Sequence, residues 1–213
     1  GSSAAALTAG VVIGSQLLNL NWSRHRILDE GARMEGHPDN VAACVLGSIV
    51  ASSIDSAGRT HAVRLELPSN YEIAVVVPDF PLPTAQARAV LPDTYTRADV
   101  VFNVQRSALL IAALCTGSTE SFSSALEDRI HQPYRATLIP GLAEMLCLKA
   151  PGLLGCSLSG AGPSVLVFFE TGQEDVTRLF QEEFERHGHS AHIYFTGIQR
   201  DGVLLCPDRV TAS

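Results

Sequence analysis

Cysteine is sparse in this chain and follows no spacing that would bind a metal cluster or build a disulfide framework. No two cysteines stand in a CxxC pattern, and their number is odd: Cys44, Cys115, Cys147, Cys156 and Cys206. Reduced thiols are typical of proteins in reducing compartments. We therefore expect a cytoplasmic protein, or a plastid-stroma protein if the source is a plant.

Positive charge is also in short supply. Lys and Arg number 15 against 22 Asp and Glu, which gives a net charge of −7. Because binding to nucleic acid depends on basic surfaces that release counterions, nucleic acid is not expected as a partner. The longest apolar run, around residues 108–114, is too short to span a bilayer, and the start lacks the basic region of a secretory signal. The sequence thus predicts no membrane partner.

The composition allows a proper core in one large domain or two small ones. Of the 213 residues, 46% are apolar and 17% are charged. Helical patterns come first, and helical and strand patterns alternate afterwards. This order predicts an α+β fold with two lobes.

Helices are predicted at residues 3–20, 24–34, 99–115, 121–130, 142–150 and 174–187. The first is apolar nearly all round, which fits a buried helix. In three of the others, an inner side is expected. It carries Ile27, Leu28 and Met34 in the helix at 24–34, Val100, Val104, Ala108 and Ile111 in the helix at 99–115, and Val176, Leu179, Phe180 and Phe184 in the helix at 174–187. Pro133 and Pro140 are expected to separate the helices around them.

Strands are predicted at residues 61–67, 73–77, 191–196 and 202–205, with a strand, a glycine-rich turn and a second strand over 153–169. Residues 41–52 read as helix and then strand without a clear boundary. The run 73–77 is continuously apolar, which predicts a strand at the centre of a sheet.

The run Glu35-Gly36-His37-Pro38-Asp39-Asn40 carries four polar side chains around one glycine and one proline. Each polar group would need a buried partner if it lay in a core, so the run favours a rigid turn that faces a ligand. A carboxylate there can hold Mg²⁺, and Asn40 offers a donor and an acceptor. The alternative is structural, with Asp39 and Asn40 as a turn or helix cap and His37 as a half-buried histidine.

Two small-residue runs point to phosphate. In Ser159–Ser164 and just before it, Gly155, Gly160 and Gly162 permit positive φ and let backbone amides approach an anion. At the start, Gly1–Ala5 would leave the first amides of a helix exposed, and a serine hydroxyl there can approach Mg²⁺. A hairpin turn and a plain helix cap are the simpler explanations.

These motifs together resemble those of the homoserine kinases, within the GHMP superfamily of small-molecule kinases. The resemblance rests on the start, the EGHPDN run, the SGAGPS run, and the stretches Thr84–Pro92 and Gln132–Gly141, in the family's order over nearly the whole chain. In the family, a Pro-x-x-x-Gly-Leu run and several strands precede the Gly-Ser-Ser start. The start could be an expression scar, but we expect a missing upstream part.

The resemblance implies a role for each matching residue. The loop Gly1, Ser2, Ser3 and Ala4 would wrap the phosphates of ATP, and Ser3 with Glu35 would hold Mg²⁺, with Glu30 as a competitor for Glu35. The residues expected around homoserine are His37, Asp39, Asn40, Thr84, Arg88, Arg135 and Gly160, with Gly162 in the same motif. Catalysis is assigned to Asn40 and Arg135. A bidentate guanidinium suits a free carboxylate.

The implied reaction is ATP-dependent phosphorylation of the L-homoserine side-chain hydroxyl to O-phospho-L-homoserine, in threonine biosynthesis. Related kinases place an aspartate where this chain has Asn40, which cannot act as a base, so positioning is expected to dominate catalysis. The implied fold is the remainder of an N-terminal ATP-binding domain at residues 1–56 and a ferredoxin-like C-terminal domain at 57–213. This piece alone is expected to bind ATP weakly and to be inactive.

Three alternatives stay open. The chain could be another GHMP kinase, acting on mevalonate or a sugar, or a non-catalytic relative that binds a small ligand. A cysteine hydrolase built on Cys156 and His37 is a third, although Cys156 stands in an apolar context. A homodimer is also left open.

Overall fold

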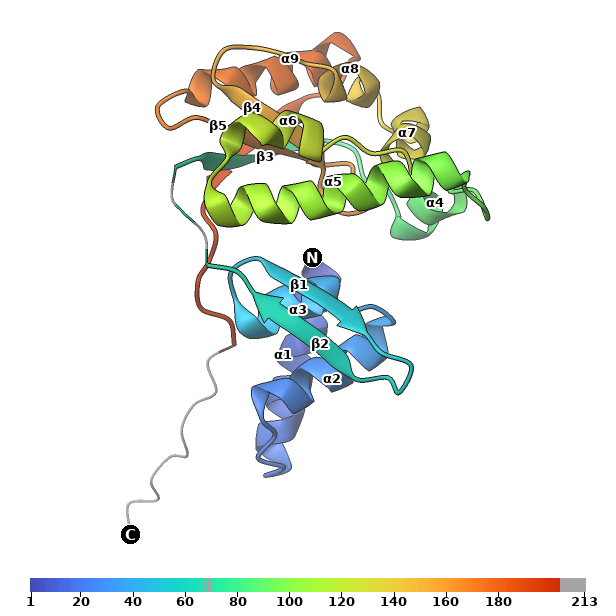
Figure 1. Cartoon of the computed structure of the whole chain (residues 1–213), viewed down its shortest axis with the longest axis vertical. Coiled ribbons are helices and arrows are strands. Elements are labelled where there is room, and N and C mark those ends of the chain that lie inside the picture. Colours follow the sequence, from blue (N-terminus) through green and yellow to red (C-terminus); the bar gives the residue numbers. More distant parts are fainter. Residues whose placement is uncertain (67, 69, 204–213) are drawn as a thin grey trace. The chain divides into compact units, whose positions relative to one another are not determined.

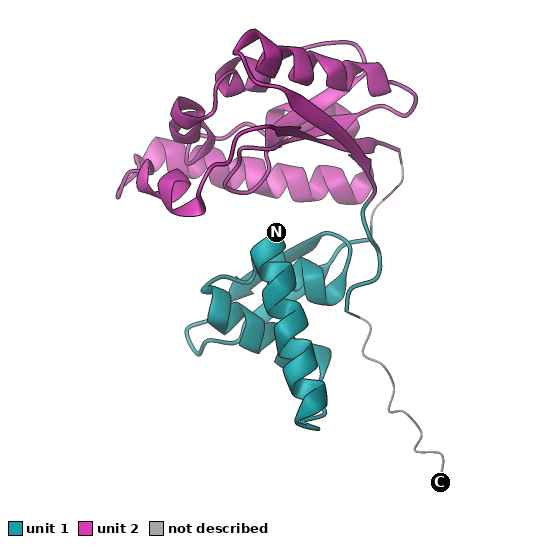
Figure 2. Cartoon of the chain, turned by 180° about the vertical axis from the view of Figure 1, so that it is seen from behind, with its two compact units in different colours: residues 1–66, 198–213 teal, residues 67–197 magenta. Residues whose placement is uncertain are grey.

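The computed structural model describes residues 1–66, 68 and 70–203. The chain forms two compact units, residues 1–66 with 198–213 and residues 67–197, which Figure 2 distinguishes by colour. Mixed helix and strand in two units confirm the predicted α+β class.

Unit 1 packs three helices beside a two-stranded hairpin. Its elements are α1 (Ser2–Leu17), α2 (Arg24–Glu35), α3 (Asp39–Leu46), β1 (Val50–Ile54) and β2 (Thr60–Arg64). The strands pair antiparallel, from Val50 opposite Arg64 to Ile54 opposite Thr60. The core gathers one side of every helix: Ala4, Ile27, Leu28, Val41, Ala42 and Val45.

Residues 198–203 follow unit 2 in the chain and are hydrogen-bonded to the rest of unit 1. The amide of Ser48 donates to the carbonyl of Gln199 at 2.8 Å, and the amide of Val203 donates to the carbonyl of Val45 at 3.2 Å. A Cβ at Gly202 would lie only 2.2 Å from the Val45 carbonyl oxygen. Only glycine therefore allows the two backbones to approach this closely.

Unit 2 is an antiparallel sheet with helices on both faces. Its strands are β3 (Glu72–Pro78), β4 (Leu153–Leu158), β5 (Val165–Phe169) and β6 (Ala191–Thr196), in the order β4-β5-β3-β6. Its longer helices are α5 (Arg97–Thr116) and α9 (Arg178–Arg186), and the β3-α5-β4-β5-α9-β6 succession in this strand order is that of a ferredoxin-like sheet.

Shorter helical segments complete unit 2. They are α4 (Thr84–Ala89), η1 (Thr119–Ser121), α6 (Phe122–Ala125), α7 (Gln132–Arg135), η2 (Ala136–Leu138), α8 (Leu142–Leu146) and η3 (Glu174–Thr177). On one face of the sheet, Phe169 packs in the main core with Phe180 and Phe184 of α9. On the other face, Tyr71, Phe122 and Phe168 meet edge to face at 5.1–5.9 Å between ring centroids.

Several predicted elements are confirmed. The helix predicted at 24–34 is α2, the one at 99–115 is α5, and the strand pair at 153–169 is β4 and β5. The strand predicted at 73–77 lies between β5 and β6, which is the predicted central place. The pattern that places Val176, Phe180 and Phe184 inward is confirmed by their burial.

Other predictions about buried faces are wrong. Met34 is 55% exposed, because Gly31 and Ala32 instead complete the inner side of α2. In α5 the predicted face is exposed at Val100 and Val104, because Ala113 and Leu114 supply the buried contacts. The first helix buries only Ala4, Thr8 and Ser15, so it is not buried all round.

Some predicted boundaries also differ. The helix predicted at 121–130 ends at Ala125, and the one at 142–150 ends at Leu146. Pro133 and Pro140 lie between α6 and α8, as predicted, and Pro133 also lies in the first turn of α7, where its missing N–H costs no hydrogen bond. Within the predicted strand 202–205, Gly202 and Val203 form no strand and the rest lies outside the described residues, as does Cys206.

Helix α5 is long and apolar enough, by length and composition, to cross a membrane. The apolar run at 108–114 did not indicate this, because the helix extends beyond it in both directions. A single such helix is weak support for a membrane span. The helix also carries Arg106, whose guanidinium lies 3.6 Å from the centroid of the Phe102 ring.

Candidate active site

The first turn of α1 presents unpaired backbone amides. Gly1 precedes the helix, and the first intrahelical bond runs from the Ala5 amide to the Gly1 carbonyl at 3.0 Å. The amides of Ser2, Ser3 and Ala4 therefore have no partner within the helix, and the helix dipole makes this end attractive to an anion. A Cβ built at Gly1 would lie 4.0 Å from Asn40 Oδ1, so the predicted phosphate loop and the EGHPDN run lie side by side.

The structure brings the two predicted Mg²⁺ ligands together. The Ser3 hydroxyl donates to Glu35 Oε2 at 3.4 Å, although the residues are 32 positions apart. Glu30 is engaged elsewhere, because Arg33 contacts it closely and Arg26 lies 3.6 Å away. The hydrogen bond from Arg33 lowers the pKa of Glu30. The contacts within unit 1 therefore favour Glu35 over Glu30 as the partner of Ser3.

The EGHPDN run joins two helices and is held by its own side chains. Gly36 ends α2 with φ +87°, and Asp39 begins α3. His37 Nδ1 lies 2.8 Å from Asp39 Oδ1, which also accepts the backbone amide of Asn40 at 2.6 Å. Asp39 thus orients His37 and Asn40, so the turn has the structural role of the alternative interpretation. That role is compatible with the predicted ligand binding.

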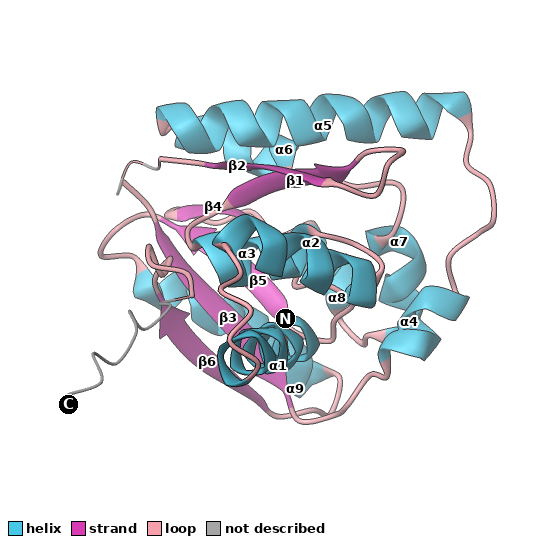
Figure 3. Ribbon diagram, turned by 90° about the horizontal axis from the view of Figure 1, so that it is seen from below, coloured by secondary structure: helices cyan, strands magenta, loops and turns pink. Residues whose placement is uncertain are grey.

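In unit 2, Arg135 joins three of the motifs predicted from the sequence. Its Nε donates to the Ala87 carbonyl at 3.1 Å and its Nη1 donates to the Gly160 carbonyl at 3.0 Å. Helices α4 and α7 consequently lie beside each other (Figure 3), and Arg88 is close enough to lower the pKa of Arg135 in addition to the larger effect of burial. A bidentate grip of Arg135 on a carboxylate would require one of these bonds to break. Thr84 stands exposed at the start of α4.

The glycine-rich turn between β4 and β5 is shaped by two positive-φ glycines. Gly160 has φ +60° and Gly162 has φ +89°. A Cβ at Gly162 would approach Ile139 Cδ1 to 2.8 Å, whereas one at Gly160 would meet nothing within 4 Å. Gly155 is different from the prediction: it lies in β4 without positive φ, and its missing side chain makes room for Leu126.

Sequence reasoning missed two buried side chains that support this site. Gln132 is 3% exposed, and its side chain accepts from the Leu158 amide at 2.7 Å and donates to the Leu126 carbonyl at 3.1 Å. Asp128 accepts backbone amides from Ile130, His131 and Gln132 at 2.6–3.2 Å. Both sit beside the Pro-Tyr-Arg run of the motif, which was the only signal pointing to them.

Hydrogen bonding keeps Asp128 ionised. Burial alone would raise the pKa of Asp128, but the side chain of Asn103 and the amides of Gln132 and His131 outweigh burial and lower that pKa. The carboxylate therefore fixes the backbone immediately before Arg135 as a charged acceptor.

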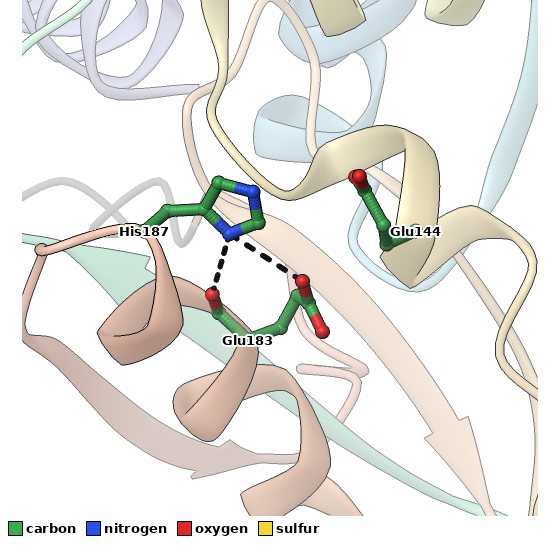
Figure 4. A group of neighbouring side chains, drawn as sticks. All are labelled: Glu144, Glu183 and His187. Carbon is green, nitrogen blue, oxygen red and sulfur yellow. Dashed lines mark hydrogen bonds and ion pairs between the residues drawn. The ribbon is translucent and has the colours of Figure 1, made fainter.

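A second cluster of ionisable groups lies away from these motifs. Figure 4 shows Glu144 of α8 near Glu183 and His187, with ligand atoms within 4.8 Å of one another. Glu183 is buried, its carboxylate contacts Arg186, and His187 Nδ1 lies 3.4 Å from Glu183 Oε1. The same His187 nitrogen lies 3.0 Å from the Glu183 carbonyl. Arg186 and His187, at the end of the same helix, thus account for the buried charge of Glu183.

Cys156 is unsuited to catalysis. It lines a cavity of about 370 Å³ between α6, α7, α8 and β4, and its thiol donates to the Met145 carbonyl at 3.2 Å. Burial raises the pKa of Cys156 to about 12. A thiol that stays protonated at neutral pH is a poor nucleophile, which argues against the cysteine hydrolase alternative.

The predicted site residues divide between the two units. Unit 1 holds Gly1, Ser2, Ser3, Ala4, Glu35, His37, Asp39 and Asn40, and unit 2 holds Thr84, Arg88, Arg135, Gly160 and Gly162. Within each unit, these residues lie at helix ends and in tight turns.

Comparisons with known proteins agree with this arrangement. The model of the GHMP kinases N terminal domain matches residues 1–48, and that of the GHMP kinases C terminal domain matches residues 110–186. A homoserine kinase of Solibacter usitatus is 65% identical over 96% of this chain and 67% of its own length. One of Deinococcus radiodurans is 50% identical over the same shares.

Solved structures agree as well. A crystal structure of homoserine kinase from Cytophaga hutchinsonii matches with a TM-score of 0.79 and 26% identity, over 94% of this chain and 66% of that one. The chain thus spans about two thirds of the length of the relatives it matches. The chain belongs to the homoserine kinase family of the GHMP kinases.

Proposed function

We propose that the complete protein transfers the γ-phosphoryl group of ATP to the side-chain hydroxyl of L-homoserine, giving O-phospho-L-homoserine in threonine biosynthesis. The 65% identity to a homoserine kinase over nearly the whole chain carries this proposal. The donor set of unit 1 supports it, because exposed helix-start amides, a serine hydroxyl and a carboxylate are the groups that hold a phosphate chain with Mg²⁺.

The residues of unit 1 fit the phosphate side of this reaction. Ser3 and Glu35 would hold Mg²⁺, and the amides of Ser2, Ser3 and Ala4 would receive phosphate oxygens. Bound Mg²⁺ would neutralise charge on the transferred group. The contact between the Ser3 hydroxyl and Glu35 keeps both oxygen ligands in one place.

Asn40 would orient the hydroxyl of the substrate. Its carboxamide has no acid–base function at neutral pH, but it can accept from the hydroxyl and donate to a neighbouring oxygen. It lies next to Gly1, where the phosphate loop begins. Transfer in this chain would therefore depend on alignment more than on removal of the hydroxyl proton.

The residues of unit 2 would serve the amino-acid end of the substrate. Thr84, Arg88 and Arg135 are proposed to contact the homoserine substrate. His37 and Asp39 keep the homoserine-binding role that the family resemblance implies for them. Because Arg135 Nε and Nη1 are bonded to the protein, Nη2 is the nitrogen left to meet a carboxylate among its described hydrogen bonds. We propose a one-point contact from Arg135 in place of the bidentate grip.

The proposed function is tested by ADP release from the complete protein with homoserine, mevalonate and galactose as acceptors. We expect turnover with homoserine alone. Asn40→Ala should lower kcat/KM by ~100-fold, because a misplaced hydroxyl loses alignment. The control is Gln16→Ala, an exposed amide near the far end of α1. Preference for mevalonate or galactose would move the protein to another GHMP kinase, and no turnover with any acceptor would favour a non-catalytic relative.

The cytoplasmic location, a homodimer, the division into family domains at residues 56 and 57, and the inactivity of this piece alone stay predictions. Tight ATP binding to the 213-residue chain in a calorimetric titration would contradict the last of these.

A further inference from the structure

The guanidinium of Arg135 is held on a third side by a histidine one turn earlier in the chain. Arg135 Nη1 lies 3.2 Å from His131 Nδ1, in addition to its bonds with the Gly160 and Ala87 carbonyls. Nη1 carries two hydrogens, so one meets His131 and the other meets Gly160. The histidine thus completes the set of acceptors that fixes the plane of the guanidinium.

This contact dictates the protonation state of the histidine. An arginine only donates hydrogen bonds, so His131 Nδ1 has to accept and cannot carry a proton. In the neutral ring the hydrogen then lies on Nε2, which faces Asp128 Oδ1 at 3.8 Å. Asp128 is itself fixed by Asn103 and by the amides that follow it. A fixed carboxylate, a neutral imidazole and a guanidinium therefore stand in one row.

We propose that His131 is a positioning residue, whose neutral imidazole holds Arg135 in place for the anionic group of the substrate and releases it when the imidazole is protonated. The inference rests on the proposed function for the identity of the substrate, but not for the contact itself. A protonated imidazole has no acceptor for Nη1 and places a second cation beside the guanidinium, so both effects act in the same direction.

The charges around the histidine support this behaviour. Burial lowers the pKa of His131, the carboxylate of Asp128 raises it, and the cation of Arg135 lowers it again, with a net decrease. Around Arg135 the further groups are Arg88 and Tyr95. The histidine is therefore neutral at pH 7, and it becomes charged only below the ordinary pKa of histidine.

The test compares two substitutions in the complete protein over a range of pH. His131→Asn keeps an acceptor oxygen close to the position of Nδ1 but does not titrate, whereas His131→Ala removes the acceptor. At saturating ATP, the wild-type KM for homoserine should rise about tenfold as the pH falls below the ordinary histidine pKa near ~6.5. His131→Asn should show no such rise, and His131→Ala should have a KM about tenfold higher at every pH, with kcat changed less.

The control is His192→Asn, an exposed histidine on β6 that should keep the wild-type profile. A wild-type KM that does not change with pH, or a His131→Asn variant that keeps the wild-type rise, would overturn the proposal.

A second measurement separates this proposal from the proposed function. In the protein without substrate, the imidazole NMR signals of His131 should titrate below the ordinary range, and Arg135→Met should raise that pKa because a neighbouring cation is removed. These results would support the contact even if the acceptor assay identified a different substrate. An unchanged titration in Arg135→Met would contradict it whatever the substrate.

Discussion

Gln132 offers the sharpest test of how the fold supports the candidate site. Its side chain bridges α7, which carries Arg135, to the Leu158 amide at the end of β4 and to the Leu126 carbonyl. Gln132→Met keeps the length and flexibility of the side chain but removes both hydrogen bonds. The perturbation therefore leaves a buried amide and a part-buried carbonyl without partners.

The expected cost follows from those two groups. A buried polar group left unpaired costs about 1–3 kcal/mol, and the apolar side chain regains about 1 kcal/mol on burial. The net loss should be about 1–5 kcal/mol. For a chain of this size a loss of 1 kcal/mol lowers Tm by about 2–4 °C, so we expect Tm to fall by roughly 2–20 °C.

The measurements on the complete protein are thermal unfolding for Tm, urea unfolding for the free energy, and hydrogen exchange. The Leu158 amide should exchange at least ~10-fold faster in Gln132→Met, since that amide loses its acceptor. Gln105→Met makes the same chemical change at an exposed position of α5 and should stay within about 0.5 kcal/mol of wild type. If the two variants had equal stability, the bridge would not hold α7 to β4 and the reasoning would fail.

Three further predictions concern the metal ligand, the glycine turn and acid stability. Glu35→Gln should lower kcat/KM in the ADP assay by ~10–100-fold, with partial recovery at high Mg²⁺. Glu30→Gln should change kcat/KM by no more than about twofold. The reverse order would exchange the roles of the two glutamates. Gly162→Ala should lose about 2–4 kcal/mol in urea unfolding, because φ is +89° and the new Cβ lies 2.8 Å from a side-chain methyl, whereas Gly160→Ala should lose only about 1–2 kcal/mol. The folded-state pKa of Asp128 is lowered, so its contribution to stability is fully present above the ordinary carboxyl pKa of ~3.9. That contribution is lost as the pH falls through the lowered pKa. Asp128→Asn should therefore lose less stability than wild type over this acidic range in urea unfolding.

The sequence predicted the elements of the fold better than their faces. The run 73–77 is apolar at every position, which suits a strand covered on both faces, and β3 has a neighbouring strand on each edge. Along α5 apolar residues occur on every side, so periodicity could not select Ala113 and Leu114 over Val104. The helix predicted beyond Ala125 stops because Asp128 captures the amides that would continue it.

The candidate site was predictable where a motif carries it. The pairing of Ser3 with Glu35 agrees with the metal roles implied by family resemblance, although no spacing rule joins residues so far apart. His131, Gln132 and Asp128 were not predicted as supporting residues, because their partners are backbone groups and side chains that only the tertiary fold brings near. Neither composition nor periodicity predicts contacts of this kind.

The place of β3 has a consequence for how the protein is made. Its two neighbours in the sheet, β5 and β6, both follow it far along the chain, and β6 is the last strand of the described residues. While the ribosome is still synthesising those partners, the nascent chain carries a continuous apolar strand with both edges open. Chaperone binding in the interval, and aggregation when translation stalls before Thr196, would act on this one segment.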